Sequence, residues 1–147
     1  MGNNEYLKLR EKQQAEFDAL PLKAAYGEKQ FNEMMTAWGL DPVKDQNKVF
    51  HLVAGMYYLR KDSKLISETL KRHQEEMQKA IAADPTGEGF IFDMFTAEMA
   101  NHEYGYTGDI GETLDALGLT AEEINGSETL QNGLRLAHKY IMQSSED

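Results

Sequence analysis

Glu98, His102 and Asp109 are the residues whose types and spacing come closest to forming a chemical site. Glu98 and His102 stand four positions apart, and Asp109 follows after a glycine-containing turn. Residues four apart lie one above the other on a helix, so one metal ion could be bound by Glu98 and His102, with Asp109 arriving from the turn. Carboxylate and imidazole ligands suit zinc, manganese or iron. One hypothesis is therefore a small metal-dependent enzyme.

The same residues have a simpler interpretation. Their spacing matches neither the His-Glu-x-x-His motif of zinc proteases nor the paired Glu-x-x-His motif of di-iron bundles, and the stretch holds a single histidine. Glu98 and His102 would then form a hydrogen bond or an ion pair at the end of a core helix. The chain also lacks a Gly-x-Ser-x-Gly motif and a phosphate-binding Gly-x-x-x-x-Gly-Lys motif. The sequence favours a non-enzymatic protein, with no catalytic residue and no cofactor.

The segment from Phe90 to Asp109 must position these groups. It contains three phenylalanines and two methionines, and Phe92, Phe95 and Met99 recur at intervals of three and four. This spacing places them on one face of a helix that continues to His102. Full burial of a Phe or Met side chain stabilises a protein by about 1.5–3 kcal/mol, so these five residues contribute on the order of 10 kcal/mol. The pattern predicts a central, buried helix with a polar end.

Capping residues, glycines and apolar periodicity predict further helices along the chain. They are expected over 4–20 (the N-terminal helix of residues 1–20), 28–38, 63–83, 109–117, 120–125 and 127–142, followed by a frayed tail at 143–147. Residues 48–61 are ambiguous, because their apolar residues fit both a helix and a strand. We predict a short buried element there, broken near Gly55 and then partly extended, with a small hairpin as the alternative. The expected fold is mainly α: a compact single-domain bundle of about six or seven unequal helices over residues 1–147.

Charge is distributed unevenly along the chain. The net charge is −10, and residues 81–147 carry 2 Lys or Arg against 13 Asp or Glu. A surface that neutralises phosphates needs Lys and Arg, so we expect no direct nucleic-acid binding by the C-terminal half. An acidic surface can instead contact a basic groove on a protein partner. The alternative is that the acidic surface only keeps the protein soluble.

Cysteine usage and hydropathy bear on the compartment. Cysteine is absent, so disulfides, thiol nucleophiles and Cys-based zinc sites are excluded. The N-terminal residues lack the apolar core of a secretory signal, and no apolar run is long enough for a membrane span. We expect a cytoplasmic protein without a membrane partner.

Short segments in three parts of the chain are similar to segments of other proteins. They are Gln30-Phe31 with Gly39-Leu40, Gly55-Met-Tyr-Tyr58 ahead of Arg60-Lys-Asp62, and above all Asn101-His-Glu-Tyr104 followed by Thr113-Leu-Asp-Ala-Leu-Gly-Leu119. In these segments the chain resembles an uncharacterised group of small proteins from phages and mobile elements of gut-type bacteria. The group has no assigned activity, so the resemblance implies no catalytic residue. It implies a setting in which small acidic proteins occupy host or defence machinery, as antirestriction and anti-CRISPR proteins do.

The leading functional hypothesis is a non-enzymatic acidic binding protein. It would inhibit a nucleic-acid-processing enzyme by mimicking DNA, with its acidic C-terminal half in a basic groove of the partner. The predicted contacts are Tyr104, Tyr106, Asp109, Glu112, Asp115, Glu122 and Glu123. The alternatives are the metal-dependent enzyme built on Glu98, His102 and Asp109, and a homo-oligomer, such as a homodimer, formed through Tyr and Met surfaces.

Overall fold

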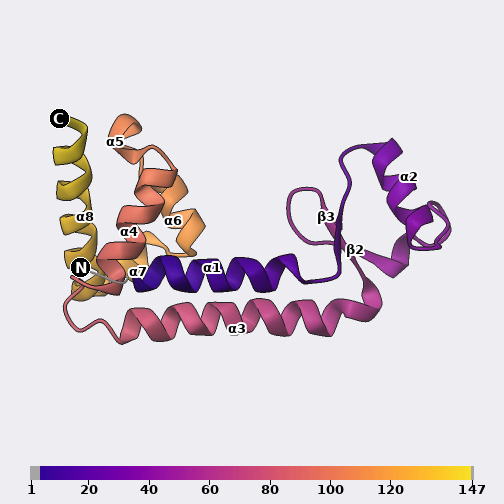
Figure 1. Ribbon diagram of the computed structural model, residues 1–147, viewed down its shortest axis with the longest axis horizontal. Helices are drawn as coiled ribbons and strands as arrows, with labels where there is room; N and C mark the ends of the chain where they lie inside the picture. Colours follow the sequence, from indigo (N-terminus) through magenta and orange to yellow (C-terminus); the bar gives the residue numbers. More distant parts are fainter. Residues whose placement is uncertain (1–3, 147) are drawn as a thin grey trace. The chain divides into compact units, whose positions relative to one another are not determined.

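The computed structural model describes residues 4–146 and shows a mainly α-helical chain (Figure 1). The prediction of a mainly α fold is confirmed. In chain order the elements are α1 (Glu5–Asp18), β1 (Leu22–Ala24), α2 (Glu28–Ala37), a 3-10 turn (Gln46–Lys48), β2 (Val49–His51), β3 (Met56–Leu59), a second 3-10 turn (Arg60–Asp62), α3 (Ser63–Ala82), α4 (Phe90–Asn101), α5 (Tyr104–Thr107), α6 (Gly111–Leu117), α7 (Ala121–Asn125) and α8 (Glu128–Glu146). The described residues thus form eight α-helices, where six or seven were predicted. The additional one is α5, a single turn in the stretch that was predicted as a glycine turn.

The backbone contacts divide the chain into two compact units. The larger unit contains residues 4–12 and 75–146 of the described chain, and the smaller unit contains residues 13–74. Helices α1 and α3 contribute residues to both units. That the chain folds as one domain stays a prediction from its length.

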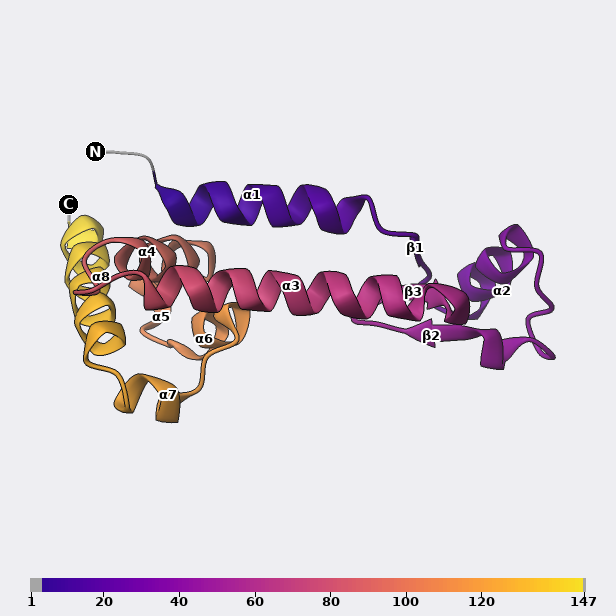
Figure 2. The same ribbon diagram turned by 90° about the horizontal axis from the view of Figure 1, so that it is seen from below.

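Helix α4 forms the core of the larger unit. Ile91, Met94, Phe95 and Met99 are completely buried. The helix packs mainly against α8, which lies beside it in both views (Figures 1 and 2). Four buried side chains of this size stabilise the unit by on the order of 10 kcal/mol. The prediction that this helix is central and buried is therefore confirmed.

The loop between α3 and α4 is organised by the buried side chain of Asp84. One carboxylate oxygen accepts hydrogen bonds from the backbone N–H groups of Thr86 (3.2 Å) and Gly87 (2.9 Å). The other accepts from Gly89 (3.1 Å) and Ile91 (3.0 Å). Since the first N–H groups of a helix have no partner within the helix, Asp84 caps α4 from outside. It thereby fixes where the central helix begins.

The smaller unit contains a three-stranded antiparallel sheet in the order β1-β3-β2. Val49 pairs with Leu59 in the hairpin of β2 and β3, and Leu22 pairs with Tyr58 on the other edge of β3. The hairpin alternative for residues 48–61 is confirmed. Strand β1 was not predicted, because three residues after a proline carry no periodic signal and pair only with a strand more than thirty positions away.

Gly55 allows β1 and the hairpin connection to approach closely. A Cβ atom on this residue would lie 2.4 Å from the Tyr26 ring and 2.8 Å from the carbonyl oxygen of Ala25. The Ala25 N–H donates to the Gly55 carbonyl over 2.8 Å, which extends the pairing beyond β1. The glycine is therefore needed for backbone proximity, and the predicted break near Gly55 is the turn of the hairpin.

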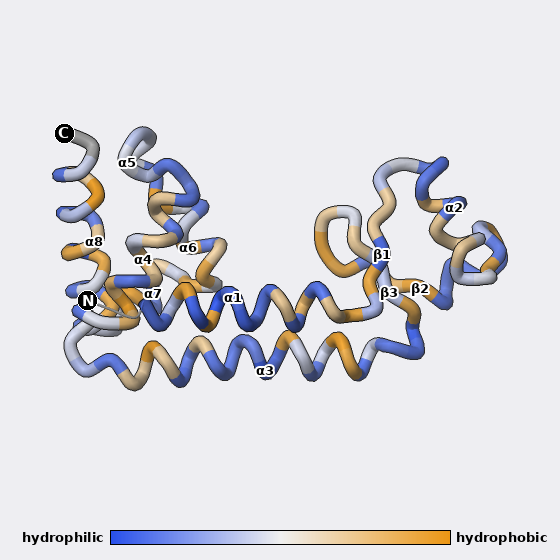
Figure 3. The backbone as a smooth tube through the Cα atoms, viewed as in Figure 1, coloured by the Kyte–Doolittle hydropathy of each residue, from blue (hydrophilic) through white to orange (hydrophobic). Residues whose placement is uncertain are grey.

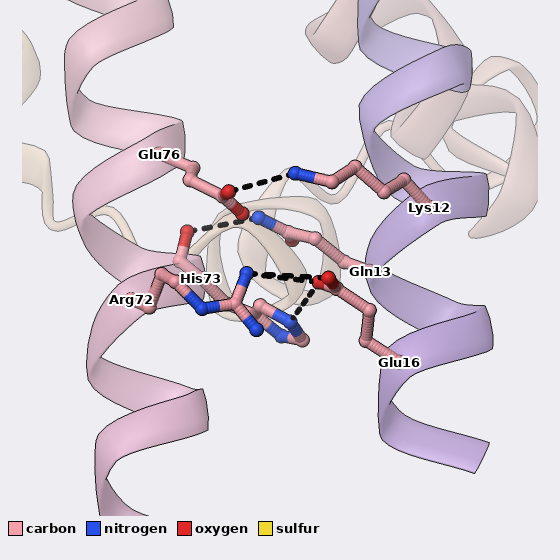
Figure 4. Close-up of polar contacts among 6 residues, drawn as sticks. All are labelled: Lys12, Gln13, Glu16, Arg72, His73 and Glu76. Carbon is pink, nitrogen blue, oxygen red and sulfur yellow. Dashed lines mark hydrogen bonds and ion pairs between the residues drawn. The ribbon is translucent and has the colours of Figure 1, made fainter. Parts of the chain in front are cut away.

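Helices α1 and α3 have polar contacts between their side chains (Figure 4). Along α3, hydrophobic and hydrophilic positions alternate with the turn of the helix (Figure 3). Within the smaller unit, Glu16 accepts a hydrogen bond from Arg72 (3.1 Å) and lies 2.9 Å from His73 Nε2. The His73 side chain is only 11% exposed. Within the larger unit, Lys12 Nζ lies 2.9 Å from the Glu76 carboxylate.

Among the helices formed by residues 4–146, none combines the length and the apolar character that a membrane span requires.

Candidate functional site

Glu98 is a buried carboxylate on the core helix of the larger unit. Its side chain is 4% exposed. The Tyr6 hydroxyl donates a hydrogen bond to Oε2, and Arg10 Nη1 lies 3.4 Å from the same oxygen. Asn101 Nδ2 donates to Oε1 over 3.1 Å. The burial cost of this charge is therefore offset by donors on both oxygens.

His102 lies at the end of α4 beside Glu98. Helix α4 stops at Asn101 because Glu103 adopts a left-handed backbone conformation, with φ of 55°. His102 still donates its backbone N–H to the Glu98 carbonyl over 3.0 Å, so the two side chains remain stacked. Its Nε2 lies 3.8 Å from Glu98 Oε1. Glu98 and His102, which were predicted to interact, thus lie at ion-pair distance from each other.

Asp109 serves a different local purpose. Its carboxylate accepts a hydrogen bond from the Gly111 N–H over 2.8 Å and so caps the start of α6. The acid that reaches His102 from this region is Glu112, whose Oε2 lies 3.5 Å from Nδ1. Helix α6 is held against α4 by Thr113, which is fully buried and donates its hydroxyl to the Glu98 backbone carbonyl over 3.4 Å.

The arrangement around Glu98 is suited to holding elements together. A metal ion at Glu98 would have to replace the Tyr6 and Asn101 donors, which already satisfy the carboxylate. Burial and the hydrogen bond to Glu98 both raise the pKa of Tyr6 well above its ordinary value, so its hydroxyl stays a proton donor. The metal site of Glu98, His102 and Asp109 stays a prediction. The geometry itself is that of a buried hydrogen-bonded ion-pair cluster.

Sequence reasoning missed two members of this cluster. Tyr6 and Arg10 lie about ninety positions before Glu98, and Tyr6 is 5% exposed. The available signal was a large aromatic residue, Tyr6, within the first predicted helix. No spacing rule connects that residue with Glu98, because the contact depends on how helices pack and not on local sequence.

The predicted partner-binding carboxylates share one property: all of them are exposed. They are Asp109, Glu112, Asp115, Glu122 and Glu123. Glu123 also belongs to a capping box, in which its backbone N–H donates to Thr120 Oγ1 and its carboxylate accepts from the Thr120 N–H.

The two predicted tyrosines differ in environment. Tyr106 is 93% exposed on α5. Tyr104 is partly buried, and its hydroxyl lies 2.7 Å from His138 Nδ1 on α8. Tyr106 therefore adds to the exposed surface, whereas Tyr104 is engaged within the larger unit.

Comparison with known proteins gives one match. No curated protein and no solved structure matches the chain. A family model described as a family of unknown function (DUF7659) matches residues 5–140 and therefore extends from α1 through most of α8. The chain belongs to this family of unknown function, DUF7659.

Proposed function

We propose that this chain is a non-enzymatic acidic binding protein whose exposed carboxylates at positions 109–123 contact a basic groove on a protein partner. The supporting observation is that five exposed carboxylates occur in this stretch while the sequence has no Lys or Arg between Lys79 and Arg135. Such a surface attracts a cationic partner and repels nucleic acid.

Two of these carboxylates are especially suited to binding. Asp115 on α6 and Glu122 on α7 are exposed, and within residues 4–146 neither forms an ion pair. Binding would not require them to break an existing contact. Asp109 and Glu123, in contrast, cap helix starts, so replacing them would change the fold as well as the charge.

The proposed partner is a nucleic-acid-processing enzyme of a bacterial host or its defence system. Such enzymes present basic grooves to phosphates, and a row of carboxylates can occupy the same groove. The resemblance to phage and mobile-element proteins gives this proposal its setting, that of an antirestriction or anti-CRISPR inhibitor.

A charge-neutralising variant tests the proposal. Glu112→Gln, Asp115→Asn and Glu122→Gln together remove three exposed charges and spare both caps. The control is Glu28→Gln, Glu33→Gln and Glu68→Gln, which removes the same charge from exposed positions of the smaller unit.

The experiment is capture from a host lysate at several salt concentrations, with each captured protein then purified and its affinity measured. We expect the affinity for the captured protein to fall as the salt concentration rises. The first variant should bind more weakly than the wild type, and the control variant should bind with the same affinity. Binding that is indifferent to salt and to the first variant would contradict an electrostatic interface.

A further inference from the structure

A pocket in the larger unit combines an apolar lining with a single cationic group. It has a volume of about 520 Å³ and is formed by residues of α5, α7 and α8 together with Ile110, which precedes α6. Ile110, Ile124 and Leu134 supply apolar surface, and Arg135 supplies charge. Pockets that bind small molecules have volumes of roughly 300–1,000 Å³ and combine apolar walls with a few polar groups. This pocket fits both descriptions.

Arg135 is the only Lys or Arg in the 59 positions between Lys79 and Lys139. Its Nη2 donates to Asn132 Oδ1 over 2.7 Å. Within the described part of the chain its guanidinium forms no ion pair with a carboxylate, although the surrounding sequence is strongly acidic. A guanidinium has five N–H donors in a planar fork that matches a carboxylate, so most of its binding capacity is available.

Tyr104 and His138 form another part of the pocket lining. The Tyr104 hydroxyl lies 2.7 Å from His138 Nδ1, and the two rings meet edge to face with centroids 5.6 Å apart. When the hydroxyl donates to Nδ1, the proton of the neutral imidazole is on Nε2, which makes Nε2 a donor. Tyr104 and His138 thus add polar groups to the pocket lining besides Arg135.

We propose that this pocket binds a small organic monocarboxylate with an aromatic or branched aliphatic body. Arg135 would bind the carboxylate, and Ile110, Ile124 and Leu134 would contact the body. One guanidinium balances one negative charge. A ligand with two or more charges, such as a nucleotide, would meet the excess of carboxylates in this half of the chain.

None of the carboxylates proposed to bind a partner lines this pocket. A failure of the partner proposal therefore leaves this inference standing, and the reverse also holds.

The test uses three probes that share one phenylpropyl body. They are 3-phenylpropanoate, the neutral 3-phenylpropanol and the cationic 3-phenylpropylamine. Each is titrated into the 15N-labelled full chain and followed by amide chemical shifts. We expect 3-phenylpropanoate to bind with a dissociation constant of about 1 mM, a value typical of ligands of this size, and to shift amides near Ile110, Ile124 and Arg135. The alcohol should bind at least about tenfold more weakly, because it lacks the charge-assisted hydrogen bonds to Arg135.

Two variants of α8 complete the test. Arg135→Gln should weaken 3-phenylpropanoate binding about tenfold or more, whereas Lys139→Gln should leave it unchanged. Both residues are exposed, and Lys139 lines a different hollow. Equal binding of the carboxylate and the alcohol would overturn the proposal. So would undiminished binding by Arg135→Gln, or no shifts with 3-phenylpropanoate up to about 10 mM.

Discussion

The Tyr6 hydroxyl donates a hydrogen bond to the Glu98 carboxylate, which joins the first turn of α1 to the buried face of α4. Both residues are almost inaccessible to solvent, at 5% and 3% exposure. A buried carboxylate that loses a hydrogen-bond donor still bears the cost of its desolvation. The stability of the Glu98 carboxylate in the core therefore depends on the packing of α1.

Tyr6→Phe should lower the free energy of unfolding at neutral pH by about 1–3 kcal/mol. The substitution keeps the ring, which packs edge to face on Phe90 with centroids 5.7 Å apart, and removes only the donor to Glu98. Urea denaturation followed by circular dichroism measures the change. Tyr106→Phe is the matched control, because that ring is 93% exposed, and it should have no effect. Equal stabilities of the two variants would contradict a structural role for the hydroxyl.

The same contact predicts a loss of stability at alkaline pH. Burial and the hydrogen bond to Glu98 raise the pKa of Tyr6 in the folded protein. Above the ordinary tyrosine pKa of about 10, the unfolded chain loses this proton while the folded chain retains it, so stability falls as pH rises. Denaturation curves from pH 8 to 11 should show a fall for the wild type that is smaller for Tyr6→Phe. Parallel curves for the two proteins would show that Tyr6 titrates alike in both states.

Asp84→Asn should destabilise the protein by about 1–3 kcal/mol, because four backbone N–H groups converge on the carboxylate. An amide presents a single oxygen acceptor. Burial alone would raise the pKa of Asp84, but these hydrogen bonds outweigh it and hold the pKa below its ordinary value. The carboxylate thus contributes stability above the unfolded pKa of about 3.9, and this contribution is lost as pH falls through the folded pKa. Melting temperatures from pH 2 to 7 should converge for the two proteins only at the acidic end.

Asp93→Asn should raise the stability of the folded protein at neutral pH, whereas Asp84→Asn should lower it. Burial and the nearby charge of Asp84 raise the pKa of Asp93, so its ionised form is disfavoured in the folded protein. The group contributes stability only at low pH, and that contribution is lost as pH rises through the folded pKa. At pH 7 the substitution should raise the melting temperature by less than Asp84→Asn lowers it. A drop in melting temperature at pH 7 would mean that the Asp93 carboxylate makes a favourable contact in the fold.

The sequence predicted the elements better than their contacts. The burial of α4 was predicted from its large apolar residues, of which Phe95 and Met99 are fully buried and Phe92 is only partly buried. The partner of Glu98 was not predictable, since Tyr6 lies 92 positions away and only tertiary packing brings it near. Two residues close in sequence also have roles other than those predicted. Asp109 caps α6, and it is Glu112 that approaches His102. Local patterns therefore identify which groups are present at the site but not which of them meet.

Gly133→Ala should destabilise the protein even though alanine is a better helix former than glycine by about 1 kcal/mol. Helix α8 crosses α4 and the Asp84 loop so closely here that a Cβ atom would lie 2.3 Å from Ile91 Cγ2 and 2.8 Å from the Gly87 carbonyl oxygen. Neither neighbour can move easily, because Ile91 is fully buried and the loop backbone is held by Asp84. Overpacking of this kind costs about 1–3 kcal/mol, which exceeds the gain in helix propensity.

The matched control for this prediction is Gly126→Ala. Its Cβ atom would come no closer than 3.5 Å to the backbone, and Gly126 has φ of −89°, which any residue adopts. We expect the control to be neutral or slightly stabilising in thermal denaturation, while Gly133→Ala lowers the melting temperature by several degrees. If both variants melted like the wild type, the close approach of α8 to Ile91 and Gly87 would be wrong, and with it the packing that places Arg135 at the pocket.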